Sequence, residues 1–471
     1  MKLKALILPL TFFVLSFTLR MYKLDNPLGD WHSWRQADTA SVAREYTKTG
    51  IDLFHPKYLD LSSIPSGLDN PEGWRMVEFP MINALHAIVA NTFPQLGLVE
   101  WGRVLSAIAS SLTVIILYLL TRKLSGKLVG VFVGLIYAIL PYNIFYGRVI
   151  LPEPYLVLFM MSSLYFFVLY WDTKRIHHYI HTLLTLTLAV LLKPTALVIL
   201  LPMVGYALAA LASPLYTYLL SLALPFLAII PYLLWRRYIA AYPAGIPASD
   251  WLFNGNGIRF KGAWFRWLFG ERIGKMILGY WGLIPFGAGL AALGERKKET
   301  LVYGGFLLGS LAYLAIIATG NVQHDYYQIQ IMPTIAIFVG LGFATLIRSA
   351  KGLRRLYIAL LSTFILVLSL ALSWYELRGF FWVNNSAMVE AGQAVDKLVP
   401  AEALIIAPYM GDTAFLFQTN RRGWPIGGEI EDKISKGADY YVTTTRDDEY
   451  NKLIKEYSVI QETDTYSIIK L

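Results

Sequence analysis

The sequence predicts an all-α polytopic membrane protein with a small C-terminal α/β domain. Of its 471 residues, 56% are hydrophobic and only 15% are charged, and the mean hydropathy is +0.49. A soluble domain is less apolar, and about a quarter of its residues are charged. Apolar stretches close to the ~20 residues needed to cross a bilayer recur along the chain. Basic residues, in addition, gather in alternate connections between these stretches.

The apolar stretches predict about 11 transmembrane helices. The first follows a basic start, MKLK, and has no small-residue cleavage site, so we expect it to be an uncleaved first helix. The predicted helices cover residues 3–20, 102–121, 128–146, 154–171, 178–192, 195–212, 215–236, 276–293, 301–318, 331–347 and 356–377.

The basic residues predict the orientation of the chain, because cytoplasmic loops are enriched in Lys and Arg. With the N-terminus inside, the cytoplasmic loops hold Arg122, Lys123 and Lys127; Lys174 and Arg175; Arg296, Lys297 and Lys298; and Arg348, Lys351, Arg354 and Arg355. The loops 21–101, 147–153, 237–275 and 319–330 then lie outside, with everything after Phe380. The same bias accounts for the formal charge of +9, so no nucleic-acid partner is expected.

The first outer loop, residues 21–101, is the first long polar segment and contains two predicted interfacial helices. TASVAREYTK, residues 39–48, has the pattern of a short amphipathic helix with Asp38 or Thr39 as N-cap. Met81 to Phe93 is apolar but short and precedes a proline, so we expect it to lie in the membrane interface rather than to span.

The predicted transmembrane domain comprises residues 1–380, and residues 381–471 are predicted to form a soluble extracytoplasmic α/β domain. ALIIAP and ADYYVTTT have the pattern of buried strands, and SVIQETDTYSIIKL that of a hairpin. AMVEAGQAVDKLV and DEYNKLIKEY have the pattern of amphipathic helices.

Three carboxylates of the first outer loop are candidate catalytic groups, namely Asp30, Asp38 and Glu78. Such a group, placed where water meets the apolar phase, can act as a general base for a hydroxyl or amine acceptor. The alternative is a helix cap or a salt bridge, most of all for Asp38. The neighbouring His32, Arg35, Gln36 and Arg75 are predicted to bind substrate, flanked by Trp31, Trp34 and Trp74.

Cations on the predicted outer side suit an anionic lipid phosphate, which an arginine can bind through two oxygens at once. Lys193 lies between two apolar runs in AVLLKPTALVILLP, where an unpaired charge is expensive and a partner or function is expected. The alternative is a lysine that extends to the outer headgroups. The candidate phosphate ligands are Arg35, Lys57, Arg75, Arg148 and Lys193.

Two outer turns contribute further candidates for substrate binding. GRVILPEP carries Arg148 and Glu153, and GNVQHDYYQIQIMP carries His324, Asp325, Tyr326 and Tyr327. These turns could close over one cavity, or their charges could simply hold the loops in place. No metal site, cofactor or nucleotide site is expected, because the chain has no Cys and lacks an HExxH-like pattern, a P-loop and a dinucleotide fingerprint.

In the order of these motifs the chain resembles the integral-membrane glycosyltransferases of the C-type (GT-C) fold. The branch that it resembles contains the protein O-mannosyltransferases and the aminoarabinose transferases. The resemblance rests on a carboxylate soon after helix one, on AREY and EFP, and on GRVILPEP, LLKPTALVILLP, HDYYQIQIMP and the terminal NRRGWP. It extends over the whole chain.

The resemblance implies transfer of one sugar from a polyprenyl-phosphate donor to a lipid, glycan or protein acceptor on the outer face. It implies inversion at the sugar, a carboxylate base in the first outer loop and no obligatory metal. By position after helix one, the base corresponds to Asp30. Relatives carry an Asp-Glu pair nine residues before the Arg of the interfacial helix, but here that count from Arg44 reaches Arg35, so Asp38 remains a rival.

The resemblance also implies roles for residues further along the chain than Asp30 and Asp38. Glu78 corresponds to the second acidic position of the family, and Lys193 to the Lys of the matching helix turn. Arg148 and Glu153 correspond to an Arg and acidic pair between two helices.

Two other classes of protein stay open. A transporter or lipid-linked sugar flippase often shows repeats and polar groups at the bilayer midplane, whereas the ionisable residues here gather at outer helix ends. A non-catalytic subunit could share the fold with an inactive site.

Overall fold

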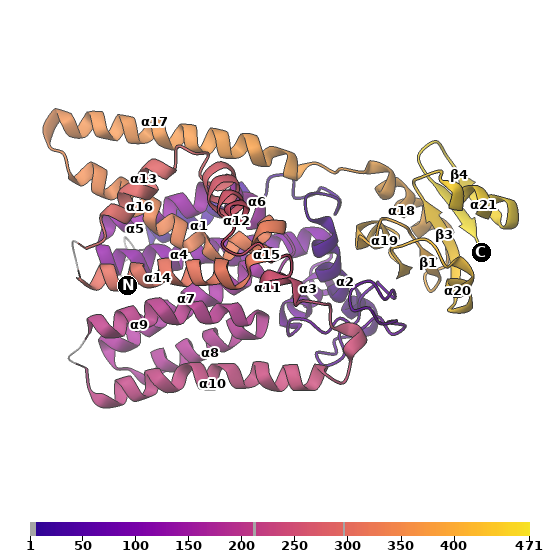
Figure 1. The fold of residues 1–471 in the computed structure, drawn as a ribbon, viewed down its shortest axis with the longest axis horizontal. Helices are drawn as coiled ribbons and strands as arrows, with labels where there is room; N and C mark the ends of the chain where they lie inside the picture. Colours follow the sequence, from indigo (N-terminus) through magenta and orange to yellow (C-terminus); the bar gives the residue numbers. More distant parts are fainter. Residues whose placement is uncertain (1–5, 211–212, 295–296) are drawn as a thin grey trace. The chain divides into compact units, whose positions relative to one another are not determined.

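The computed structural model describes residues 6–210, 213–294 and 297–471. The chain forms two compact units, each described here by itself (Figure 1). The first unit comprises Met1–Tyr22, Val104–Arg236 and Ser249–Arg378, and the second comprises Lys23–Arg103, Arg237–Ala248 and Gly379–Leu471. The predicted boundary at residue 380 stays a prediction. Residues 3–5, residues 211–212 and Arg296, which enter the sequence-based expectations, lie outside the described residues.

Each of the eleven apolar segments contains helical structure. The main helices are α1 (Ile7–Arg20), α4 (Leu98–Ser125), α5 (Lys127–Ile139), α6 (Pro141–Tyr146), α7 (Glu153–Thr173), α8 (Ile176–Leu192), α9 (Leu200–Ala209), α10 (Leu215–Ile239), α13 (Leu283–Ala291), α14 (Lys297–Ile316), α16 (Met332–Arg348) and α17 (Gly352–Leu377). Within the described ranges, six helical segments are long and apolar enough to cross a membrane. The number of eleven spans stays a prediction.

Prolines interrupt the helical structure at two places, one of them inside a predicted helix. The segment 128–146 ends as α5 at Ile139 and restarts as α6 at Pro141, because proline cannot donate the hydrogen bond that a continuous helix needs. The segment 195–212 begins with a 3-10 helix, η2 (Pro194–Ile199), directly after Lys193, which has an extended backbone.

The predicted helix 276–293 is shorter than expected. Its helical part, α13, begins at Leu283, and residues Arg266–Ile277 before it form a π-helix, η4. Long π-helical stretches are rare and often accompany functional sites. Short elements complete this region: α11 (Trp251–Asn254), α12 (Gly262–Phe265), α15 (Ala318–Gln323) and the 3-10 helices η3 (Pro243–Gly245), η5 (Asp325–Ile331) and η6 (Arg378–Phe381).

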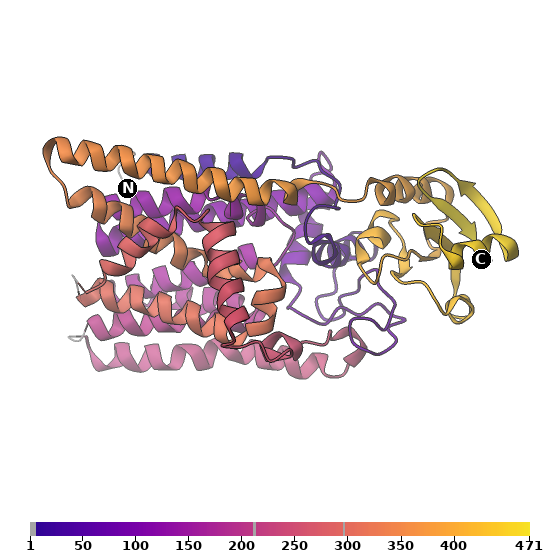
Figure 2. The ribbon, with the colours of Figure 1, turned by 45° about the horizontal axis from the view of Figure 1, so that its top comes forward.

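Helix α16 lies at the centre of the first unit, with nearly all of its residues buried. Small residues let its neighbours approach closely. A Cβ on Gly342 would lie well inside the van der Waals distance of Pro285 O, and one on Gly340 would lie 2.6 Å from Val133 Cγ2. Helix α17, in contrast, lies at the periphery in both views, with a long exposed apolar face (Figure 2). This arrangement is typical of a helical bundle in a membrane.

The second unit contains the interfacial helices of the first outer loop. Helix α2 (Ser33–Thr49) begins six residues before the predicted start, and α3 (Met81–Thr92) matches its prediction. The predicted N-cap, Asp38 or Thr39, was wrong. His32 precedes the helix with a left-handed backbone, and Asp38 lies within the helix, where tertiary contacts rather than a cap occupy its side chain. The two helices share a small apolar core of Val42, Ala43, Tyr46, Tyr58, Ala84 and Ala87.

The C-terminal part of this unit is an α/β structure with a five-stranded sheet of order β2-β1-β3-β5-β4. The three strands β2, β1 and β3 are parallel, whereas β5 runs antiparallel to both β3 and β4. The predicted strands and the hairpin are confirmed, and β2 was not predicted. The elements are α18 (Ser386–Leu398), β1 (Leu404–Ile406), α19 (Thr413–Gln418), β2 (Arg422–Trp424), α20 (Ile430–Ser435), β3 (Ala438–Thr443), α21 (Asp448–Glu456), β4 (Ser458–Glu462) and β5 (Ser467–Lys470).

The first outer loop adds a short strand-like segment to the edge of this sheet. Asp60 forms a parallel bridge with Gly423 of β2. Leu61 N donates to Gly423 O at 2.8 Å, and Gly423 N donates to Leu59 O at 2.9 Å. Leu61 also packs into the core around Ile406 and Trp424. The loop and the C-terminal sheet are therefore parts of one folded unit.

Candidate functional site

Asp30 lies in the second unit, with 1% of its surface exposed. Its Oδ2 lies 3.0 Å from Arg103 Nη2, and its Oδ1 accepts a hydrogen bond of 2.9 Å from Gln36 Nε2. A buried carboxylate needs such partners, because burying an unpaired charge is costly. The candidate base is thus held by one residue from α2 and one from the start of α4.

Arg103 is a functional candidate that the sequence analysis missed. The same guanidinium donates to the backbone carbonyls of Leu24 and Asn26, so it orders the segment that leads to Asp30. A charge inside the predicted apolar helix 102–121 is the same kind of signal that singled out Lys193. It could therefore have been found from the sequence.

Glu78 and Arg35 form a second ion pair in this unit. Arg35 Nη2 lies 2.5 Å from Glu78 Oε1, with side chains 8% and 15% exposed. Arg35 is in the first turn of α2, three residues before Asp38, and Glu78 precedes α3. The pair brings together two predicted residues that are 43 positions apart in the chain.

Asp38 is held by two different partners. Arg75 Nη2 lies 2.9 Å from its Oδ2, and Thr413 Oγ1 donates to its Oδ1 at 2.7 Å. Thr413 is the first residue of α19 in the C-terminal α/β structure. A single threonine in TAFLFQ gives no sequence signal for this contact.

Two further carboxylates near Asp38, those of Asp60 and Asp412, have raised pKa values. Burial raises the pKa of Asp60 to about 7, partly offset by hydrogen bonds from Ser62. Burial also raises the pKa of Asp412 to about 6, although its carboxylate caps the first turn of α19 through Ala414 N. Neither group was singled out from the sequence, because each lies in a polar stretch without helical or strand periodicity.

Two further predicted substrate ligands, Lys57 and His32, also belong to the second unit. Lys57 pairs with the exposed Glu72 at 2.5 Å and lies 4.6 Å from the centre of the Trp74 ring. His32 packs edge-on against Trp31 at a centroid distance of 5.3 Å. Trp31 in turn stacks on Phe380.

Lys193 and Glu153 form the central pair of the candidate residues in the first unit. Lys193 Nζ donates to Glu153 Oε1, while Glu153 Oε2 is buried without a hydrogen-bond partner. The ammonium group also lies 5.2 Å from the centre of the Tyr327 ring and 5.9 Å from that of Tyr326. The two tyrosine rings stack on each other at 4.5 Å. The two predicted outer turns and the Lys193 break therefore converge.

Asp325 and a residue that was not predicted, Arg272, continue this cluster. Arg272 Nη1 lies 3.5 Å from Asp325 Oδ2, and Tyr146 OH donates to Asp325 Oδ1 at 2.5 Å. Arg272 belongs to the π-helix η4, where it stands among other charges in RWLFGERIGKMI, so the sequence does not distinguish it. His324 packs at the edge of the same cluster, with its ring 5.6 Å from that of Tyr326.

Arg148 is fully buried and follows Gly147 in the turn before α7. Its guanidinium carbon lies 5.7 Å from the centre of the Phe145 ring. Arg148 is thus a third cation among the candidate residues of the first unit, besides Lys193 and Arg272.

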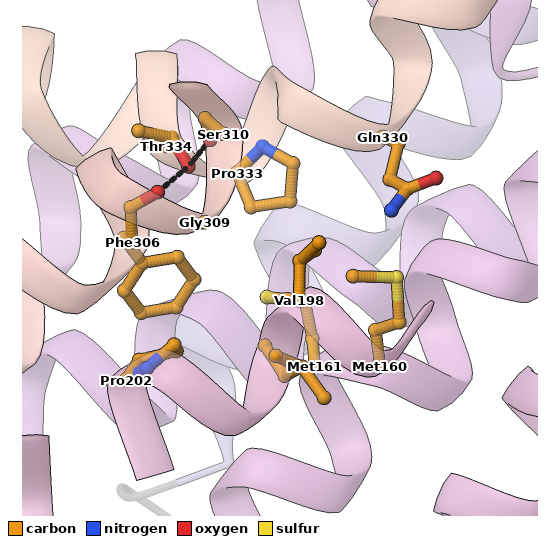
Figure 3. Close-up of a pocket in the computed structure, with 11 residues that line it drawn as sticks. Met160, Met161, Val198, Pro202, Phe306, Gly309, Ser310, Gln330, Pro333 and Thr334 are labelled. Carbon is orange, nitrogen blue, oxygen red and sulfur yellow. Dashed lines mark hydrogen bonds between the residues drawn. The ribbon is translucent and has the colours of Figure 1, made fainter. Parts of the chain in front are cut away.

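A mostly apolar cavity of the first unit is lined in part by residues of η2 and η5 (Figure 3). Its empty space amounts to about 260 Å³ when the open solvent at its mouth is counted. Gln330 lines the cavity and forms two hydrogen bonds of 2.8 Å with Thr195. Since Thr195 follows Lys193 by two residues and Gln330 lies one helical turn after Tyr327, the cavity begins close to the charged cluster. The other lining residues are Met160, Met161, Val198, Ile199, Pro202, Phe306, Gly309, Ser310, Pro333 and Thr334.

Metal ligation is not indicated by the geometry of the described residues. In residues 6–210, 213–294 and 297–471, no three His, Asp or Glu side chains are grouped so that they could hold a metal ion. The candidate residues instead form ion pairs of opposite charge.

Comparison with known proteins gives a family match over part of the chain. Residues 77–235 match the model of the family described as dolichyl-phosphate-mannose-protein mannosyltransferase. No curated protein sequence matches the chain.

Solved structures match the chain over nearly its whole length. ArnT from Cupriavidus metallidurans bound to undecaprenyl phosphate superposes with a TM-score of 0.67 at 14% identity, covering 98% of this chain and 97% of ArnT. The Archaeoglobus fulgidus oligosaccharyltransferase with Zn and sulfate gives 0.61 at 13% identity, covering 93% and 68%. AglB from the same archaeon, with an inhibitory peptide and a dolichol-phosphate, gives 0.58 at 12% identity, covering 93% and 69%.

The fold is therefore the C-type fold of integral-membrane glycosyltransferases. The resemblance to the branch of O-mannosyltransferases and aminoarabinose transferases is confirmed by the family match and by the ArnT structure. The apolar helices and this fold also confirm a multi-pass membrane protein.

Proposed function

We propose that the protein is a membrane glycosyltransferase that moves one sugar from a polyprenyl-phosphate donor to a lipid, glycan or protein acceptor. In this reaction the acceptor oxygen or nitrogen attacks the anomeric carbon while the bond from that carbon to the phosphate oxygen breaks. The electron pair leaves with the polyprenyl phosphate, and the acceptor proton passes to a carboxylate of the protein. Attack from the face opposite the phosphate inverts the anomeric centre.

The observation that carries this proposal is the setting of Lys193. Its ammonium group stands at a helix break within an apolar bundle, beside stacked tyrosines and paired with Glu153. Preorganised cations of this kind stabilise the charge that develops on a leaving phosphate. This setting supports an anionic ligand that shares Lys193 with Glu153.

The apolar cavity supports a lipid-linked rather than a water-soluble donor. It begins at Gln330 and continues between α7, α9, α14 and α16, where isoprene units would find apolar contacts. Two proteins of the same fold have been seen with lipid phosphates, ArnT with undecaprenyl phosphate and AglB with a dolichol-phosphate. Their ligands agree with the chemistry that the Lys193 cluster favours.

Asp30 is proposed as the base, and Glu78 is proposed to orient the acceptor through Arg35. The hydrogen bonds from Arg103 and Gln36 hold the Asp30 carboxylate in a fixed position, as a general base requires. Asp38 is clamped between Arg75 and Thr413 from a distant part of the chain, which supports a structural role for it. His32, Gln36, Lys57 and Arg75 remain proposed substrate contacts.

The orientation of the site is also a proposal. The basic residues of the connections favour an extracytoplasmic first outer loop and C-terminal domain, with residues 1–380 as the transmembrane catalytic domain and residues 381–471 as the soluble domain.

The proposed donor site is tested by binding of a polyprenyl phosphate to the purified protein in detergent. Losing a hydrogen bond to a charged group costs about 1.5–3 kcal/mol, so Lys193→Ala should weaken binding by roughly ten- to a hundredfold. Lys174→Ala, a change on the predicted cytoplasmic side, serves as the control. Unchanged affinity in both Lys193→Ala and Arg148→Ala would favour a lysine that merely extends to the headgroups.

The base is tested by turnover with polyprenyl-phosphate sugars that differ in the sugar. Asp30→Asn should lower turnover by about 10² or more while donor binding persists, because the amide keeps the size and loses the basicity. If Asp30→Asn stays active and Asp38→Asn does not, the base is Asp38. If neither change nor Glu78→Gln affects transfer of any sugar, the flippase alternative replaces the enzyme.

A further inference from the structure

Helix α2, which carries three of the candidate residues, packs between α3 and α19 of the same unit. From α3, Asn83 Nδ2 donates to Thr39 O at 2.7 Å. From α19, Phe417 O accepts from Arg44 Nη1 at 2.7 Å, and the Phe417 ring lies 3.5 Å below the Arg44 guanidinium. Both faces of α2 are thus in contact with other elements, and its orientation depends on them.

Thr413 makes the most buried polar contact between α19 and α2. Thr413 and Asp38 are 4% and 5% exposed as whole residues, so little water reaches their 2.7 Å hydrogen bond. The same hydroxyl lies 3.2 Å from Trp34 O in the first turn of α2. A hydrogen bond to a buried charged group is stronger than one between neutral groups.

Thr413 lies near the carboxyl end of a parallel strand, which is where open α/β sheets bind their ligands. It follows the loop that leaves the carboxyl end of β1, the central strand of the parallel set β2-β1-β3. In open α/β sheets, ligands bind outside the carboxyl ends of the strands, where the strand order reverses. Here the side chain of Asp38 from α2 reaches the residue at that edge.

The register of α2 determines where two other side chains point. Arg35 precedes Asp38 by three residues, which places both on one side of the helix, and Arg35 pairs with Glu78. Gln36 precedes Asp38 by two residues and holds Asp30. A rotation or shift of α2 at Asp38 therefore moves the partners of both proposed acceptor-side carboxylates.

We propose that Thr413 is a positioning residue, through which the C-terminal α/β structure fixes α2 and thereby the geometry of Asp30 and Glu78. This proposal rests on the proposed function in one respect, namely that Asp30 and Glu78 are the groups that act in the reaction. It assigns the C-terminal structure a role in the reaction without contact to the reacting atoms.

The test uses two matched substitutions in the full chain. Thr413→Val keeps the shape and removes the hydroxyl, whereas Thr413→Ser keeps the hydroxyl. A displacement of about 1 Å far from the chemistry can cost up to 10² in rate, so Thr413→Val should lower kcat by roughly tenfold and leave the donor KM unchanged. Thr413→Ser should stay close to the parent. In an Asp38→Asn background, Thr413→Val should have little further effect, because the contact is already weakened.

Hydrogen exchange of the backbone amides of residues 35–43 gives a readout that needs no activity. Faster exchange in Thr413→Val but not in Thr413→Ser supports the positioning role even if the enzyme assignment fails with Asp30→Asn. Equal exchange in both variants, or equal loss of kcat in both, overturns it. If Thr413→Val fails to fold, Asp38→Asn tests the same hydrogen bond from its other partner. Unchanged exchange of residues 35–43 in Asp38→Asn would then overturn the proposal.

Discussion

Arg103 Nη2 lies 3.0 Å from Asp30 Oδ2, and neither side chain has any exposed surface. The two residues come from different elements, since Arg103 is in the second turn of α4 and Asp30 is in the irregular segment before α2. Removing one partner of such a pair leaves a buried charge without compensation, whereas removing both does not.

Arg103→Met should therefore destabilise the protein by about 3–5 kcal/mol. Thermal unfolding of the purified protein in detergent measures the effect. The double variant Arg103→Met with Asp30→Asn should recover part of the loss, because the uncompensated carboxylate is then absent. A double variant no more stable than Arg103→Met alone would contradict this explanation.

Asp60 should make stability depend on pH. Its pKa is raised by burial from the ordinary value of an aspartate to about 7, so the folded state binds the proton more tightly than the unfolded state. The resulting stabilisation is complete below about pH 4 and is lost as the pH rises towards and through 7. On the scale of 1.36 kcal/mol per pKa unit, the change is on the order of 4 kcal/mol.

Asp60→Asn should flatten this part of the curve of unfolding free energy against pH. The exposed Asp250→Asn is the matched control and should leave the slope unchanged. Equal slopes for the parent and Asp60→Asn between pH 4 and 7 would show that Asp60 is not the group responsible.

Gly342→Ala should disturb the packing of α16 against α13. The added methyl would collide with the backbone carbonyl of Pro285, which cannot move aside as a flexible side chain could. Overpacking of this kind costs about 1–3 kcal/mol. Gly287→Ala on α13 is the control, because its Cβ meets nothing within 4 Å. Thermal unfolding should separate the two variants, and equal midpoints would argue against close packing here.

A reporter fused after Leu471 should be active only on the extracytoplasmic side, because the basic residues of alternate connections favour a cytoplasmic position for those connections. A second fusion, in the predicted cytoplasmic loop near Lys174, should show the opposite activity. A C-terminal fusion active in the cytoplasm would move the proposed site to that side and would count against the enzyme assignment as well.

The helices were largely predictable, because an apolar run of bilayer length has few alternatives to a helix. The interruption at Lys193 and Pro194 was predicted, although its 3-10 helix was not, whereas the break at Pro141 was missed because one helix was predicted over residues 128–146. The π-helix around Arg272 was not predictable, since its charges and glycines interrupt the apolar pattern.

Some ion pairs of the candidate residues could be expected from the sequence, whereas their partners from distant parts of the chain could not. Lys193 and Glu153 stood out as charges beside apolar runs, and the structure pairs them. The contact between Asp38 and Thr413 joins positions 375 residues apart, and no local pattern encodes it. Asp38 also had an ordinary local explanation as a helix cap, which the longer helix α2 excludes.

The bridge between Asp60 and Gly423 has a consequence for synthesis of the chain. More than 360 residues separate the two partners, and a ribosome adds about 5–20 residues per second, so the segment around Asp60 waits for roughly 20 to 70 s before its partner strand exists. During that interval its backbone donors and acceptors have no sheet to join. The pairing of the first outer loop with β2 can therefore form only late in synthesis, after the segment that separates the two partners has been made.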